Sequence, residues 1–348
     1  MTAAPPNGGT GVICPACGEP AVAGDSFCES CGTELAPPLA SNGPARYTAQ
    51  CPVCSLDGSA LPAGISADGY CQACGRKVPS GRDHVELNLG LLAGVTDRGL
   101  RHRRNEDAMA LAATDTPAGP AAIAVVCDGV SSSPRPDDAS LAGAQAAVRM
   151  LLASVRRGDD PGEASLAAIR QAHEAVAILG SASQAPSATY ISAIVAAGSV
   201  TVCWLGDSRA YWLASQSEPA RLTTDDSLAE EMVARGEMTQ AEALASPQAH
   251  VITRWLGADV TTPAPHVTRF EPPGRGAVLI CSDGLWNYLP EAAGLAALAL
   301  PAAFHDPASA ADVLLKFALD AGGLDNITIV LVPFPPMRPA LLLQEVPP

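Results

Sequence analysis

The sequence predicts an α+β fold in which sheets are faced by helices, preceded by a small cysteine-rich region. Three observations lead to this prediction: short apolar runs, two long alanine-rich segments between them, and eight cysteines before residue 80. The chain has 348 residues, of which 48% are hydrophobic and 16% charged, so it can build a substantial core. It is long enough for one large domain and a small one.

The apolar runs are typical of buried strands. They are "AAIAVVCD" (121–128), "ATYISAIVAAG" (188–198), "VTVCWLGD" (200–207), "AVLICSD" (277–283) and "NITIVLVPF" (326–334). The alanine-rich segments 137–158 and 162–179 are expected to be helices, and the first has acidic residues at its start and arginines at its end, as the helix dipole favours. Because both helices come between two groups of strands, layered sheets are favoured over alternating βα units.

The early cysteines form four Cys-x-x-Cys pairs, and two such pairs supply the four thiolates that structural zinc prefers. We expect two zinc ribbons, at 1–35 and 51–80, joined by a Pro/Ala/Gly/Ser-rich linker at 36–50, with one structural Zn²⁺ in each. The expected ligands are Cys14, Cys17, Cys28, Cys31, Cys51, Cys54, Cys71 and Cys74. The alternative, a secreted disulfide framework, is disfavoured because the sequence shows no signal-peptide pattern and has a large apolar core downstream.

The charge balance bears on possible partners. The chain has 36 acidic and 21 basic residues and a net charge of -15, which argues against nucleic acid or an anionic membrane as the main partner. Residues 1–80 hold three basic against six acidic residues, so the ribbons are expected to be structural or to bind a protein. No apolar run reaches about 18 residues, so we expect a cytoplasmic protein.

Carboxylates mark the ends of the expected strands. Asp128, Asp207 and Asp283 each end one, and Asp325 begins another. Burying an unpaired charge is costly, and a cation shared by converging strand ends would remove that cost. Oxygen ligands of this kind select Mg²⁺ or Mn²⁺ over zinc. The alternative is that each aspartate caps a turn before Gly or Asn.

The order of six motifs resembles the protein phosphatase 2C family of metal-dependent serine/threonine phosphatases, bacterial type. The motifs are "TDRG" with "NEDA", "VVCDGV", "VTVCWLGDSRAYWL", "LTTDDSLAEEMVARG", "LICSDGLW" and "LDNITIVLV". The resemblance covers a domain from residue 86 to about 335, which leaves 336–348 as a tail. It implies an α-β-β-α four-layer sandwich of two antiparallel sheets with a bimetal site at one end of the sheets. The implied reaction is hydrolysis of phosphoserine or phosphothreonine by a metal-activated water.

The resemblance also implies roles for single residues. Asp128 would bridge two ions, and the Gly129 carbonyl would bind one of them. The remaining ligands to two or three Mn²⁺ or Mg²⁺ ions would be Glu106, Asp107, Asp207, Asp283 and Asp325, with Asp207 at a weaker third site. Residues 222–257 resemble the flap beside the active site. Phosphorylated proteins would be the partners, with a serine/threonine kinase or its substrates as candidates.

The basic stretch before Glu106 departs from the family. The arginine that holds the substrate phosphate is expected four residues before the glutamate, where this sequence has His102. In an extended segment His102 and Arg104 would face the same way as Glu106, and Arg101 and Arg103 the opposite way. Three alternatives remain: Arg104 holds the phosphate, a bulge turns Arg101 or Arg103 inward, or His102 contacts the substrate.

Animal members of the family have a histidine after "DG" that can protonate the leaving oxygen, and Val130 at this place cannot. His102 or a metal-bound water is therefore our hypothesis for the general acid. With Asp128, Asp283 and Arg104, His102 completes the predicted catalytic set.

Two other functions are compatible with parts of the sequence. Cys203 and Arg209 have the Cys-x5-Arg spacing of cysteine phosphatases, but the apolar run between them is strand-like and Asp207 would repel a phosphate. A signalling adaptor that binds phosphoproteins with little turnover is the second alternative. A non-catalytic descendant would have no reason to keep costly clustered carboxylates, so the enzyme is favoured.

Overall fold

The structure is a computed structural model that describes residues 12–13, 20–21, 39–41, 71–72, 81–196, 198–246 and 251–336. Seven of the eight expected zinc ligands, all but Cys71, lie outside these residues, as does the tail from 337 onward. The two zinc ribbons and their metal ions therefore stay predictions. Within this region β1 (Val12–Ile13) and β2 (Pro20–Ala21) pair antiparallel on either side of Cys14 and Cys17 in the sequence.

Two antiparallel sheets form the centre of the described chain. The first has the order β14-β10-β9-β7-β6-β3 and the second the order β12-β11-β15-β16-β5-β4. The strands of the first sheet are β3 (Leu39–Ser41), β6 (Ala108–Thr116), β7 (Gly119–Cys127), β9 (Tyr190–Ala196), β10 (Ser199–Leu205) and β14 (His266–Phe270). Those of the second are β4 (His84–Asn88), β5 (Ala93–Asp97), β11 (Arg209–Leu213), β12 (Ala220–Arg221), β15 (Gly276–Cys281) and β16 (Ile327–Phe334).

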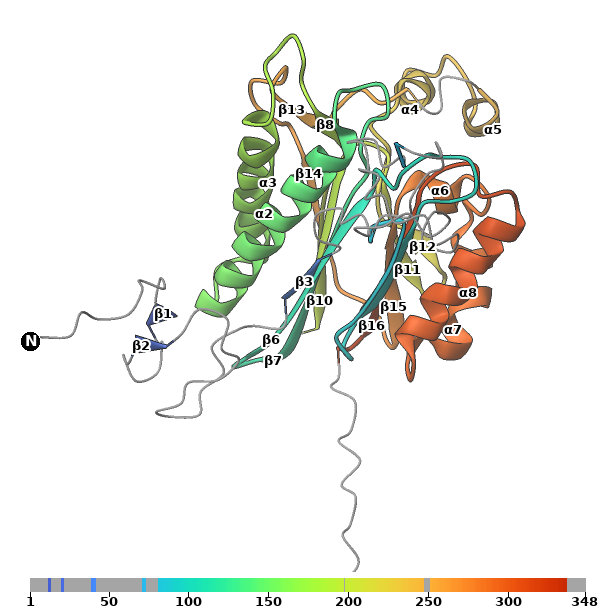
Figure 1. Cartoon of the computed structure of the whole chain (residues 1–348). Helices are drawn as coiled ribbons and strands as arrows, with labels where there is room; N and C mark the ends of the chain where they lie inside the picture. The colour runs from blue at the N-terminus through green and yellow to red at the C-terminus, as the bar shows by residue number, and fades with distance from the viewer. Residues whose placement is uncertain are drawn as a thin grey trace, which may run out of the picture.

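Helices cover the outer face of each sheet (Figure 1). Helices α2 (Pro136–Arg157) and α3 (Pro161–Ala177) pack on the first sheet, and α7 (Ala292–Ala303) and α8 (Pro307–Asp320) pack on the second. The α-β-β-α sandwich expected from the sequence is confirmed. Each of the five expected strands and both expected helices is present, with bounds that differ by one or two residues.

Apolar layers hold the sandwich together. Leu111, Val126, Trp212 and Val332 belong to the core between the sheets and are at most 1% exposed. Helix α2 illustrates how the sequence builds the outer layers: Ala144, Ala147 and Leu151 recur at helical spacing and are buried on the first sheet. The chain of α2 begins with Pro136 and two aspartates and ends with two arginines before Gly158, whose φ of 77° closes the helix.

A strand occurs inside the range expected to link the two ribbons. Within 36–50, residues Leu39–Ser41 form β3 and pair antiparallel with β6, with Leu39 opposite Ala112 and Ser41 opposite Ala110. The linker thus contributes the edge strand of the first sheet. At the other end of the cysteine-rich region, β4 begins at His84, two residues before the expected start of the main domain.

The region expected to be the flap contains two short helices, α4 (Leu228–Ala234) and α5 (Gln240–Leu244). Ser227 caps α4, and Thr239 and Glu242 form a capping box on α5. After residues 247–250, which are not described, the chain returns through β13 (Leu256–Gly257), which pairs with β8 (Ser187–Ala188). No helix in the described ranges is both long and apolar enough to cross a bilayer.

Candidate active site

The fold brings the predicted strand-end carboxylates of both sheets together. Asp128 follows β7 and Asp207 lies two residues after β10 in the first sheet, while Asp283 opens α6 (Asp283–Trp286) after β15 in the second sheet. The pKa of Asp128 is raised well above its usual value, first by burial and then by repulsion from Asp107, Asp283, Asp325 and Asp207. The carboxylates at these strand ends are therefore close enough to repel one another.

Asp107 lies beneath this cluster and is fully buried. Its Oδ2 accepts hydrogen bonds from the hydroxyls of Ser282 at 2.8 Å and Thr328 at 2.7 Å. Burial raises its pKa to about 6, the two hydroxyls oppose that rise, and the Asp128 carboxyl lies within hydrogen-bond reach. Asp107 is therefore held rigidly next to Asp128.

Three residues hold Glu106 in place. Its Oε1 accepts a hydrogen bond from Arg104 Nε at 2.9 Å, its Oε2 one from the Ser131 hydroxyl at 2.6 Å, and its backbone N–H donates to Asn326 Oδ1 at 2.7 Å. Asn326 also donates to the carbonyls of Arg98 and Arg104, so it joins the basic stretch to the start of β16. Glu106 thus has a defined position, and its side chain is 10% exposed.

Gly129 lies where no side chain fits. A Cβ at this position would come within 2.5 Å of the Pro136 carbonyl oxygen and 2.7 Å of that of Glu106. The Gly129 N–H donates to the Glu106 carbonyl at 3.2 Å, and the Asp128 N–H donates to the Thr189 hydroxyl oxygen at 3.0 Å. Glycine at 129 therefore allows the start of α2 and the Glu106 loop to close around Asp128.

Burial alternates along the basic stretch, although residues 101–104 form a turn and bends rather than the extended segment considered from the sequence. Arg101 and Arg103 are exposed, whereas His102 and Arg104 turn toward the carboxylates. His102 Nε2 lies 3.1 Å from Asp325 Oδ1, and Arg104 Nη1 lies 3.3 Å from Asp137 Oδ1 in addition to its contact with Glu106. Of the three alternatives for the phosphate contact, the one that needs a bulge at Arg101 or Arg103 does not match this arrangement.

The Cys-x5-Arg alternative is wrong. Arg209 is 2% exposed and binds both oxygens of Asp225, at 2.6 to 3.1 Å, while its guanidinium stacks on the Trp286 ring at 3.6 Å. Cys203 is buried in β10, and burial raises the pKa of its thiol to about 12. Arg209 is thus committed to Asp225, and Cys203 is not a thiolate at neutral pH.

Asp207 lies beside this ion pair. Its backbone carbonyl accepts a hydrogen bond from Trp286 Nε1 at 2.9 Å, and burial, followed by repulsion from Asp225, raises its pKa to about 7. The carboxyl is 5% exposed, which separates it from the more accessible Asp283 and Asp325.

The donor set fits hard divalent cations. All the side chains of the cluster offer oxygen, and burial and mutual repulsion raise the pKa values of Asp128, Asp207 and Asp283, a cost that a bound cation would remove. Within the described residues no three His, Cys, Asp or Glu side chains enclose a single point tightly enough to hold an ion. The agreement with Mg²⁺ or Mn²⁺ therefore lies in the chemical kind and the charge of the donor atoms, not in a closed coordination geometry.

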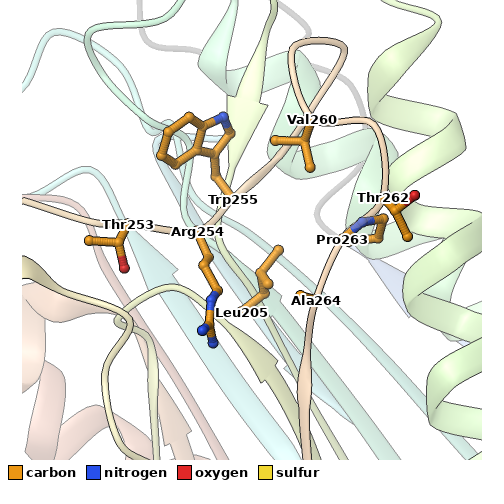
Figure 2. A pocket seen from close by; sticks show the side chains of 8 residues that line it. All are labelled: Leu205, Thr253, Arg254, Trp255, Val260, Thr262, Pro263 and Ala264. Carbon is orange, nitrogen blue, oxygen red and sulfur yellow. The ribbon is translucent and has the colours of Figure 1, made fainter. Parts of the chain in front are cut away.

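Two hollows lie beside the C-terminal part of the flap region. The smaller, about 130 Å³, is lined by residues that include Leu205, Arg254 and Trp255 (Figure 2). Figure 2 shows that Arg254 and Trp255 leave the chain in opposite directions. The larger, about 550 Å³, is a groove that begins at Val130, directly after Gly129, and has Trp255 on its far side.

Comparison with known proteins agrees with this geometry. The family model "Protein phosphatase 2C" matches residues 98–314, more than half of the chain. The chain belongs to the protein phosphatase 2C family. It is similar to the serine/threonine protein phosphatase PstP of Mycobacterium tuberculosis, with 30% identity over 250 residues that cover 69% of this chain and 44% of that protein. It is also similar to the serine/threonine phosphatase stp of Listeria innocua, with 35% identity over 147 residues, 41% of this chain and 55% of that protein.

The chain spans about half the length of the curated relatives it matches. Among solved structures it is similar to the PPM Ser-Thr phosphatase MsPP from Mycobacterium smegmatis in complex with cacodylate, with a TM-score of 0.54, 29% identity, and coverage of 69% of this chain and 97% of that one. The catalytic domain of PstP in complex with two manganese ions gives a TM-score of 0.53 and 25% identity over 69% of this chain and 96% of that one.

Several residues that position the site were not predicted. Ser131, Ser282, Thr328 and Asn326 hold Glu106 and Asp107, and they lie 25 to 221 positions away from them in the sequence. Ser131 stands in a run of three serines, which more often serve as turns and caps. Only the proximity of each residue to a site motif, "CDGVSSS", "CSDG" or "LDNIT", could have drawn attention to it.

Proposed function

We propose that this protein hydrolyses phosphoserine and phosphothreonine in proteins with the help of two or three Mn²⁺ or Mg²⁺ ions. The observation that carries this proposal is the convergence of Asp128, Asp207, Asp283 and Asp325 from the ends of both sheets, next to Glu106 and Asp107. Carboxylates packed so closely are costly without cations. The relatives named serine/threonine phosphatases support the same reaction.

Each residue of the cluster has a proposed role. Asp128 and the Gly129 carbonyl would hold the ions with Glu106, Asp283 and Asp325, while Asp207 would serve a third position. When bound, the ions would supply the Lewis acidity for attack of water on phosphorus. Asp107, expected from the sequence as a further ligand, would hold an ion only through Oδ1, because its Oδ2 is bonded to Ser282 and Thr328, and it would also keep Asp128 in place.

The substrate phosphate would be held by Arg104, with His102 beside it. Both side chains face the cluster, and the Arg104 side chain is 42% exposed, so its guanidinium can reach a ligand. His102, held by Asp325 at 3.1 Å, is the protein group proposed to donate a proton to the leaving oxygen. If instead a water does this, the histidine only positions Asp325.

The cysteine-rich region would carry two structural zinc ions and bind a protein partner. A cytoplasmic location is part of this proposal, since thiolates that bind zinc must stay reduced. Phosphorylated proteins, among them a kinase or its substrates, would be the partners of the main domain.

The test is release of phosphate from phosphoserine and phosphothreonine peptides with Mn²⁺, for the wild type, Asp128→Asn and the exposed control Asp312→Asn on α8. We expect turnover in the wild type and the control and a loss of at least about 100-fold in Asp128→Asn, because removing a group that stabilises the transition state costs about 3 kcal/mol or more. His102→Arg puts an arginine at the position where the family has one. It should lower KM if an arginine there holds the substrate phosphate better than Arg104 does.

A wild-type protein that binds Mn²⁺ and phosphopeptides but releases no phosphate would favour the adaptor instead. Calorimetry with Mn²⁺ alone provides the metal-binding measurement. An unchanged rate and pH profile in His102→Ala would exclude the histidine as the proton donor.

A further inference from the structure

The lining of the groove of about 550 Å³ includes Val130, the residue directly after the proposed metal ligand Gly129. Three segments line it: the loop 130–134 after Gly129, the segment 182–187 that ends in β8, and the segment 251–259 at the end of the flap region. Ser131, next to Val130, donates to Glu106 at 2.6 Å. The groove therefore starts one residue along the chain from the place where a phosphorylated side chain would react.

A short β-ladder joins the catalytic centre to the far side of the groove. Ala188 forms an antiparallel bridge with Gly129, and the same residue pairs with Leu256 of β13. Ser187, beside it, pairs with Gly257 and accepts a hydrogen bond from Val130 N–H at 2.9 Å. The segment that carries Trp255 is thus fixed relative to Gly129 through only one intervening strand.

Hydrogen bonds fix the wall of the groove nearest the catalytic centre, formed by residues 130–134 and 187. Ser187 N–H donates to the Ser133 hydroxyl at 3.1 Å, and Ser133 N–H donates to the Val130 carbonyl at 2.8 Å. Arg135, with a φ of 52°, extends to the Leu179 carbonyl at 3.1 Å and to Asp138 at 2.7 Å. A non-glycine residue in the left-handed region is uncommon, and here it turns the loop into α2 while holding it to the end of α3.

The opposite wall of the groove, formed by residues 251–259, is attached to the helical part of the flap region and to the first sheet. Leu228 N–H donates to the Val251 carbonyl at 2.8 Å, and Thr253 N–H to the Asp226 carbonyl at 2.8 Å. Arg254 and His266 both contact Asp226 Oδ1 at 2.8 Å, and the His266 ring stacks on Trp204. Because Arg254 points toward Asp226, its neighbour Trp255 points the other way (Figure 2), and Trp255 lines the groove.

The chemistry of the groove is that of a peptide-binding surface with a single charge. Val130, Pro134, Ile252 and the half-buried Trp255 ring supply apolar contacts, and serines and Gln184 supply hydrogen-bonding groups. Asp259 is the one charged side chain among the described lining residues. Its carboxylate is exposed and accepts the Trp255 indole N–H at 3.1 and 3.2 Å, which orients it over the groove.

We propose that this groove binds the polypeptide that flanks the phosphorylated residue and selects a basic side chain there through Asp259. The inference rests on the proposed phosphatase function, since it names the kind of substrate that this site prefers. The start of the groove next to Gly129 places the flanking residues in the groove, the Trp255 ring packs on the aliphatic part of a lysine or arginine, and Asp259 pairs with its charged end.

The test uses phosphoserine peptides that carry lysine, glutamine or glutamate at one flanking position at a time, within about four residues on either side. For each protein the measured quantity is the ratio of kcat/KM between the lysine and the glutamate peptide, which cancels changes in the metal centre. We expect a wild-type ratio of about fivefold at the position that reaches Asp259, the size of one exposed ion pair gained and one repulsion avoided. Asp259→Asn should reduce the ratio to nearly one, and high salt should reduce the wild-type ratio.

Asp312→Asn is the matched control, because it removes another exposed carboxylate, on α8, which packs on the other sheet. A preference caused by the net charge of the chain would fall equally in both variants and would overturn the proposal. Trp255→Phe keeps an aromatic ring but removes the N–H that orients Asp259. It should lower the kcat/KM ratio between the lysine and glutamate peptides while kcat stays the same. Trp255→Ala should raise KM for all peptides.

A protein that lacks phosphatase activity can be distinguished from a groove that lacks selectivity. If no peptide is dephosphorylated by the wild type, the same peptides, labelled for fluorescence anisotropy, measure binding directly. An Asp259-dependent preference for the lysine peptide in Kd would then support the groove without the reaction. An equal ratio in wild type, Asp259→Asn and Asp312→Asn, in either kcat/KM or Kd, overturns it.

Discussion

Replacing Asp225 with alanine tests the ion pair that anchors the first residues of the flap region, 222–257, to Arg209 of β11. Arg209 and Asp225 join through three N–O contacts of 2.6 to 3.1 Å, and their side chains are 2% and 3% exposed. The substitution leaves a buried guanidinium without its carboxylate, for which about 3–5 kcal/mol of unfolding free energy is expected. Arg209 keeps its contacts with the Trp286 ring and Tyr211, which favours the lower end of that range.

The assay is urea unfolding followed by circular dichroism in EDTA, so that metal binding does not contribute. For a domain of this size the loss corresponds to a fall in Tm of about 6–20 °C. Glu237→Gln is the control, since it breaks the Arg235–Glu237 pair of similar length, 2.8 Å, whose side chains are 51% and 49% exposed, and should cost about 0–1 kcal/mol. The reasoning is refuted if Asp225→Ala costs no more than Glu237→Gln.

Three further predictions concern the site itself. Gly129→Ala should cost about 1–3 kcal/mol of stability and most of the activity, because the added Cβ meets two carbonyl oxygens within 2.7 Å; Gly274→Ala, with open space around it, should be neutral in the same melts. Ser131→Ala removes the 2.6 Å hydrogen bond to Glu106 and should weaken Mn²⁺ binding about tenfold in a calorimetric titration, and unchanged affinity would contradict the role of Ser131. The pKa of Asp107 is raised to about 6 and that of Asp207 to about 7, so their contribution to stability is complete below about pH 4 and is lost as pH rises through 6 to 7. The Tm of the metal-free protein should therefore fall between about pH 4 and pH 7, and it should fall less in Asp207→Asn. Added Mn²⁺ should raise Tm more at pH 8 than at pH 5.5. The opposite trends would disprove the raised pKa values of Asp107 and Asp207.

The parts of the fold that depend on local pattern could be predicted from the sequence. The buried strands of 121–128 and 277–283 and the helix at 137–158 have periodicities and end signals strong enough to locate them within two residues. The alternation of His102 and Arg104 against Arg101 and Arg103 was predicted from the two-residue period of extended chain; the structure shows the alternation in burial, although residues 101–104 form a turn and bends rather than a strand.

Other parts depend on contacts between distant residues. Asp225 looks like any acidic residue in a polar stretch, and only the fold brings it to Arg209, 16 residues away. Three residues at 39–41, in a linker rich in proline and alanine, gave no strand signal, because their pairing depends on the free edge of β6 rather than on their own propensity. Ser282 and Thr328 read as ordinary strand-end residues until Asp107 is placed between them.

The pairing of β3 with β6 has a practical consequence for any shortened form of this protein. A chain that began at residue 81 would lack Leu39–Ser41 and leave the backbone of Ala110–Ala112 open at the sheet edge. Those residues belong to the apolar run "AMALAA" of β6, and an open, apolar edge of this kind recruits a second copy of itself. Removal of the cysteine-rich region would then produce aggregation or strand-exchanged dimers, and a loss of activity in such a form would reflect self-association rather than a missing regulatory contact.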